Sequence, residues 1–174
     1  MRFAVVVSAA FAAALLLSAC SEPTGPAPQV TRPVKPSYDL VAAIRTAGDK
    51  EKSVIDVTPL RDPGVTALQQ SALAAERAGK YQDAADQLDE AIKLSPGSPD
   101  LLQDRAEAAV YLHDYPMAEK LAQQSWEMGS KMGSLCARNW QTLMEMRLQA
   151  DDAAGAANAR KALAQCHVAG VNRF

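Results

Sequence analysis

Residues 79–85 read Gly-Lys-Tyr-Gln-Asp-Ala-Ala, and Leu88, Ala91 and Pro96 follow at helical spacing. A glycine that ends one helix is followed by an aromatic residue and then by small and apolar residues that recur every three or four positions. Alanine lets two helices approach closely, the aromatic residue wedges the turn, and the proline ends the second helix. The stretch therefore predicts an antiparallel pair of helices.

Further helices are predicted on both sides of this pair. Asp62-Pro63 has the pattern of an N-cap followed by a first-turn proline, and Gly79 ends the helix that begins there. The remaining breaks between helices are expected at residues 95–97, 113–116 and 129–133, and the last two helices at about residues 134–149 and 152–165.

The helix pairs repeat. Tyr81 and Ala84 return 34 residues later as Tyr115 and Ala118. Together with the order of residue types after Gly79, this period resembles the tetratricopeptide repeat. The resemblance covers residues 65–166, is strongest in the first repeat, and reaches the third repeat only after three extra residues are allowed around residues 128–134.

The resemblance implies an all-α fold, a right-handed α-solenoid of about three helical hairpins, at residues 63–167. Three repeats are about the minimum that can share a continuous core. A short helix from Tyr38 to about Ala47, capped by Ser37 and stopped by Gly48, and an irregular segment are expected at residues 38–62. A tail is expected at residues 168–174. Exposed ends of so short a solenoid could also be covered by a second copy, giving a homodimer.

Solenoids of this kind bind partners on the concave face formed by the first helix of each pair. The residues predicted to line this partner-binding groove are Gln69, Gln70, Leu73, Arg77, Gln103, Asp104, Glu107, Tyr111, Trp140, Gln141 and Met144. Amides can bond an extended peptide, aromatic rings supply contact area, and the two acids could select a basic partner. A solvated polar face is the alternative for the charged residues, and core packing is the preferred interpretation of Trp140.

The N-terminus has the pattern of an export signal at residues 1–19. Arg2 is followed by an apolar run over residues 3–17, too short to span a bilayer comfortably. Residues 17–20 read Leu-Ser-Ala-Cys, which resembles the bacterial lipobox and implies a mature protein that starts at an acylated Cys20. Ser21 favours the outer membrane, on its periplasmic face, in that family's sorting pattern. A secretory signal with an unmodified cysteine is the alternative.

Residues 20–37 are rich in proline and predict an extended linker between the lipid and the helices. Beyond Cys20 the remaining cysteines are Cys136 and Cys166, which fall at adjoining ends of the last two predicted helices. Because the periplasm is oxidising, we expect them to form a disulfide. Two buried thiols, or a metal site that also uses His167, are the alternatives, although no paired metal-ligand spacing supports the second.

The composition bounds the function. The chain is 48% hydrophobic and 5% aromatic with a net charge of −2, so a nucleic-acid partner is not expected. No phosphate-binding loop or nucleophile elbow is found, and no cofactor or metal is expected. The sequence predicts a membrane-anchored adaptor that binds an envelope protein or peptide and is not an enzyme. The alternatives are a metal- or thiol-dependent envelope enzyme that uses Cys136, Cys166 and His167, and a structural spacer.

Overall fold

The computed structural model describes residues 37–51 and 61–167, which lie in one compact unit of the chain. The predicted signal peptide, Cys20, most of the proline-rich linker and the C-terminal tail lie outside the described residues. Within the described part, every regular element is a helix, and no helix there is both long and apolar enough to cross a membrane.

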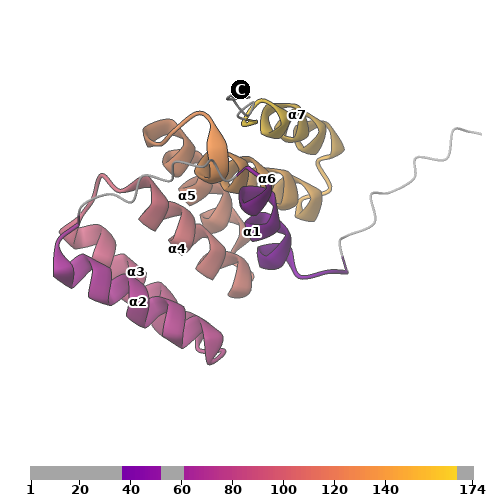
Figure 1. Ribbon diagram of the computed structural model, residues 1–174. Helices are drawn as coiled ribbons and strands as arrows, with labels where there is room; N and C mark the ends of the chain where they lie inside the picture. Colours follow the sequence, from indigo (N-terminus) through magenta and orange to yellow (C-terminus); the bar gives the residue numbers. More distant parts are fainter. Residues whose placement is uncertain (1–36, 52–60, 168–174) are drawn as a thin grey trace, which may run out of the picture. The chain divides into compact units, whose positions relative to one another are not determined.

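The helices are α1 (Leu40–Lys50), α2 (Pro63–Arg77), α3 (Tyr81–Leu94), α4 (Pro99–Tyr111), α5 (Tyr115–Met128), α6 (Gly133–Gln149) and α7 (Ala153–Ala164). They pack chiefly as three successive hairpins, α2 with α3, α4 with α5, and α6 with α7 (Figure 1). The prediction of an all-α solenoid of three hairpins is therefore confirmed.

Short polar residues begin several of these helices, as the sequence indicates. Asp62 directly precedes Pro63, and its carboxylate accepts a hydrogen bond from the Gly64 amide. Asp114 accepts one from the Met117 amide. At the start of α7, Asp152 accepts one from Gly155. Each cap satisfies a backbone donor that the helix leaves free in its first turn.

The turn inside each hairpin places one residue in the left-handed region. These residues are Gly79, His113 and Asp151, with φ of 71°, 59° and 59°. In each hairpin the next amide bonds back to a carbonyl in the last turn of the first helix, as in a Schellman motif. The turn residues are 34 and then 38 apart, so the third repeat carries four extra residues where the alignment assumed three.

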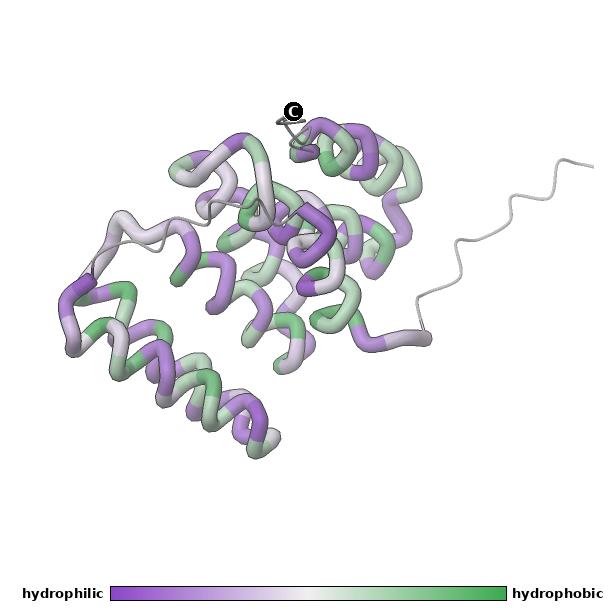
Figure 2. Tube along the Cα trace, viewed as in Figure 1, coloured by the Kyte–Doolittle hydropathy of each residue, from purple (hydrophilic) through white to green (hydrophobic). Residues whose placement is uncertain are grey.

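Alanine makes the close contacts between paired helices. Ala84, Ala85 and Ala91 of α3 are buried and share a cluster with Val65 of α2 and Leu101 of α4. Hydrophobic and hydrophilic residues alternate along α2 and α3, so each helix has an apolar side for its partner (Figure 2). The cluster runs from the first hairpin into the second, as a solenoid core requires.

The start and end of α1 differ from the prediction. Asp39, and not Ser37, caps the helix by accepting a hydrogen bond from the Ala42 amide. The helix also passes through Gly48, which is buried. A Cβ at this position would lie 2.7 Å from Cγ of Arg138 on α6. Gly48 therefore permits a close approach between two helices and does not end one.

Helix α1 packs against the hairpins, chiefly on α6 and also on α4 (Figure 1). Its Val41 and Ile44 side chains are fully buried in a cluster with Val110 of α4 and Met146 of α6. The helical domain that the sequence places at residues 63–167 therefore has an additional helix from residues 40–50 packed onto it.

The two cysteines of the last hairpin lie together. Cys136 is near the start of α6 and Cys166 follows the end of α7, with their Cα atoms 5.6 Å apart and their sulfur atoms joined. The Gly133 amide also donates to the Cys166 carbonyl at 2.8 Å, so the backbone closes the same corner. The pairing closes a loop with a sequence separation of 30 residues.

We expect unreduced protein to yield no alkylatable thiol at Cys136 or Cys166 in peptide mass mapping. Cys166→Ser should lower the free energy of unfolding by about 3–4 kcal/mol, because the unfolded chain regains the entropy of an open loop. Urea denaturation with and without reductant measures this. Two alkylated cysteines in the unreduced protein would contradict the pairing.

Candidate functional site

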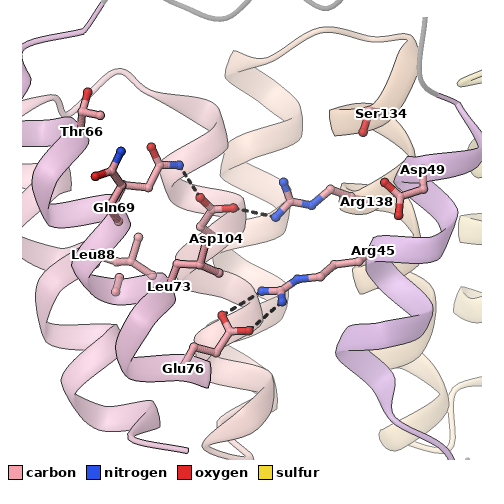
Figure 3. Close-up of a pocket in the computed structure, with 12 residues that line it drawn as sticks. Arg45, Asp49, Thr66, Gln69, Leu73, Glu76, Leu88, Asp104, Ser134 and Arg138 are labelled. Carbon is pink, nitrogen blue, oxygen red and sulfur yellow. Dashed lines mark hydrogen bonds and ion pairs between the residues drawn. The ribbon is translucent and has the colours of Figure 1, made fainter. Parts of the chain in front are cut away.

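Helices α2, α4 and α6 form one side of the hairpins, which we call the inner face. A cavity of about 580 Å³ opens on this face, between α1 and α2 (Figure 3). The side chains that line it come from all four helices and from Leu88 of α3. They are Arg45, Asp49, Thr66, Gln69, Gln70, Ala72, Leu73, Glu76, Leu88, Asp104, Ser134 and Arg138.

Four residues of the predicted groove line this cavity, namely Gln69, Gln70, Leu73 and Asp104. Gln70 is exposed, and Leu73 keeps 39% of its surface exposed although it is apolar. An exposed amide beside an exposed leucine offers both a hydrogen-bonding group and apolar area to a second molecule. The α2 wall is thus the accessible part of the predicted groove.

Three other predicted groove residues are buried, which corrects their assignment. Gln103 and Glu107 of α4 have no exposed surface, and Met144 of α6 keeps only 8%. The Gln103 amide donates to Glu107 at 3.0 Å and to Thr142 on α6 at 2.9 Å. The interpretation of these residues as partner contacts was wrong because the sequence did not show that neighbouring helices cover them.

Two further predicted residues, Tyr111 and Trp140, pack against other aromatic rings of the protein. Tyr111 stacks on Tyr81, with ring centroids 4.4 Å apart and planes 8° apart. Burial and the nearby Glu76 carboxylate raise the pKa of Tyr111 to about 12. This stacking connects the turns of the first two hairpins.

Trp140 packs edge to face on Trp126, at 5.2 Å between centroids, next to the two cysteines. Its role in the core agrees with the preferred interpretation. Gln141 donates a hydrogen bond to Glu145 at 2.6 Å. Arg77 is exposed at the end of α2 but does not line the cavity.

The centre of the inner face is an ion network around Glu107. Its buried carboxylate accepts hydrogen bonds from Arg45 of α1 at 2.7 Å and from Arg138 of α6 at 2.8 Å. Arg45 also donates two hydrogen bonds to Glu76 of α2, at 2.6 and 2.8 Å. These contacts connect four helices through two arginines and two carboxylates.

The network continues along α2. Asp104 accepts hydrogen bonds from Gln69 at 2.7 Å and from Arg138 at 2.6 Å (Figure 3). Both acids that the sequence analysis offered to a basic partner are therefore paired with arginines of the same chain. With α1 docked, the charges of both acids are therefore already compensated within the chain.

The arginines of this network stay charged. Hydrogen bonding to Glu76 and the negative charge of Glu107 raise the pKa of Arg45, although burial opposes this. Burial lowers the pKa of Arg138, but the carboxylates of Glu107 and Asp104 outweigh burial and raise it overall. A charged guanidinium with two carboxylate partners is a rigid connection between helices.

Sequence reasoning missed Arg45, Glu76, Arg138 and Thr66 as parts of this site. One signal for the buried network was available in α4, because Glu107 follows Ala106 and precedes a run of apolar residues up to Val110. A helix that is apolar on nearly every side is a buried helix, so its polar residues need internal partners.

Within the part of the chain that the structure describes, Cys136, Cys166 and His167 do not form a cluster that could hold a metal ion. The two sulfur atoms are joined to each other, and His167 lies 2.9 Å from the Glu51 carboxylate at the end of α1. The contact between His167 and Glu51 therefore connects the end of α7 to the end of α1.

We expect Glu107→Gln to lower the free energy of unfolding by about 2 kcal/mol, because Arg45 and Arg138 each lose a charged hydrogen-bond partner in a buried position. Glu90→Gln breaks an exposed ion pair with Lys93 and should leave stability unchanged. Thermal and urea denaturation of both variants give the comparison. Equal stability of the two variants would contradict the role of Glu107.

Comparisons with known proteins support the repeat. Residues 65–108, which comprise most of α2, all of α3 and most of α4, match the tetratricopeptide repeat family. A search of curated proteins gave no match. Among solved structures, the globular C-terminal domain of P. aeruginosa LpoP is 27% identical, with a TM-score of 0.57, over 60% of this chain and 99% of that chain.

The family match falls on the hairpin in which the sequence pattern is strongest, and the structural similarity extends over the domain-sized part of the chain. From the hairpins, the matched repeat and the similarity to the LpoP domain, we conclude that this chain carries a tetratricopeptide-repeat-like helical domain.

Proposed function

We propose that the protein is a lipid-anchored adaptor on the periplasmic face of the outer membrane, which binds another envelope protein through the cavity between α1 and α2. The observation that carries this proposal is the α2 wall of the cavity, where Gln70 and Leu73 are both exposed and lie three residues apart on the helix. Tetratricopeptide-repeat folds present such a face for protein partners.

The chemistry of the cavity favours binding over reaction. Four of its five charged residues, namely Arg45, Glu76, Asp104 and Arg138, are held in ion pairs with one another or with Glu107. Proton exchange with a substrate would change the charge of such a group and break its ion pair, so these residues are poorly suited to general acid–base catalysis. We therefore infer a binding site with no catalytic residue.

The location rests on the sequence of the N-terminus. Cys20 follows Leu-Ser-Ala, and Ser21 comes next, as in lipoproteins that are sent to the outer membrane. The joined Cys136 and Cys166 fit an oxidising compartment such as the periplasm. The solved LpoP domain is a C-terminal domain by its description, and the helical domain here also follows an N-terminal segment.

We expect Leu73→Arg to abolish crosslinking to the partner in intact cell envelopes, because a bulky cation replaces the apolar wall of the cavity. The experiment places a photoreactive amino acid at Gln70 and compares crosslinked products by mass spectrometry. Leu94→Arg is the matched control, because Leu94 is an apolar residue with 63% exposure that does not line the cavity.

Loss of a specific product in Leu73→Arg but not in Leu94→Arg supports the adaptor. The same products from both variants and from the wild-type protein would contradict it and favour a structural spacer. Circular dichroism of each purified variant establishes that the helices are intact before the comparison is made.

A further inference from the structure

The inner face already holds a helix. Helix α1 lies on α4 and α6, where its Val41 and Ile44 side chains are exposed by only 1% and 0%. It contacts the side of the hairpins on which a solenoid of this type receives partners. The contacts of α1 therefore show what kind of segment this face accepts.

One stripe of α1 makes the contacts. Val41, Ile44, Arg45 and Gly48 stand at relative positions 0, 3, 4 and 7, which place them on one side of a helix. The aliphatic pair enters the cluster with Met146, Arg45 bonds Glu76 and Glu107, and Gly48 lets the backbone approach Arg138. The other side of the helix is exposed at Ala42, Thr46, Asp49 and Lys50.

Polar contacts set the position of α1 at both ends. The Tyr38 hydroxyl donates to Glu145 of α6 at 2.8 Å, and His167 lies 2.9 Å from Glu51. Helices as short as α1 are marginal in water without tertiary contacts. The helical form of residues 40–50 therefore depends on this docking.

The buried acids restrict what can lie there. Glu107 keeps only Arg138 of α6 as a cationic partner unless a second cation reaches it from the helix above, and removing one partner of a buried ion pair is strongly unfavourable. A purely apolar helix would leave Glu76 and Glu107 with less positive charge than they have now. A helix with a large residue in place of Gly48 would collide with Arg138.

We propose that the α4–α6 part of the inner face is a helix-binding site, that α1 is its resident ligand, and that a partner helix with the same pattern replaces α1. The partner is a short amphipathic helix with two aliphatic residues three positions apart, an arginine directly after the second, and a glycine three positions later. This inference rests on the proposed function, because it names the chemistry of the partner.

Exchange would join the two parts of the site. Arg45 and Asp49 of α1 form one wall of the cavity, opposite Gln69 and Leu73 of α2 (Figure 3). Departure of α1 removes that wall, so a partner helix on α4 and α6 would lie beside the exposed α2 wall. Partner binding and release of α1 are then one event.

The test uses the full chain with Ile44→Asp, which undocks α1, and a fluorescent peptide of residues 37–51 followed by anisotropy. The variant should bind the peptide at least about tenfold more tightly than the wild-type chain, in which the tethered α1 occupies the site at high effective concentration. A control peptide with Arg45→Glu should bind the variant at least about tenfold more weakly, because it repels Glu76 and Glu107.

Equal affinity of the two proteins for the peptide, or equal affinity of the variant for both peptides, would overturn the proposal. So would no binding by a variant whose helices are intact by circular dichroism. If the Ile44→Asp chain does not fold, the milder Arg45→Gln chain takes its place, and its affinities for the two peptides are judged in the same way. Peptide binding does not involve Leu73, so a failure here is distinguishable from a failure of the crosslinking experiment.

Discussion

A carboxylate without exposed surface needs hydrogen-bond or ion-pair partners inside the protein. Glu107 has such partners from two neighbouring helices, α1 and α6. Arg45 reaches it from α1 and Arg138 from α6, while Gln103 bonds it from its own helix. This requirement places α1 on the hairpins, since without Arg45 the carboxylate would lose one of its two cations. The arrangement of the inner face follows from that one buried charge.

The ion network divides the inner face into two regions with different chemistry. Over α4 and α6 the surface is covered by α1, and its charges are compensated within the chain. Along α2 the surface is open, with Gln70 and Leu73 exposed. In the proposed function, recognition therefore rests on amide and apolar contacts at α2, and on whether a second helix can satisfy the buried acids as α1 does.

The helices of the repeat could be predicted from the sequence because local signals set their ends. Asp62-Pro63 and Gly79 each act through a few neighbouring residues, and the 34-residue period repeats such a local pattern along the chain. The site was predicted less well because its contacts join distant parts of the chain. Arg45 and Glu107 are 62 residues apart, and Gly48 has the pattern of a helix stop until Arg138 is seen beside it.

The pairing of Arg45 with Glu107 is tested most directly by a double-mutant cycle on the free energy of unfolding. The cycle compares Arg45→Met, Glu107→Met and the double variant with the wild-type chain. A coupling energy of at least about 1 kcal/mol is expected, because each single change leaves a charge without its buried partner and the double change removes both. A coupling energy near zero would show that α1 is not held by this ion pair.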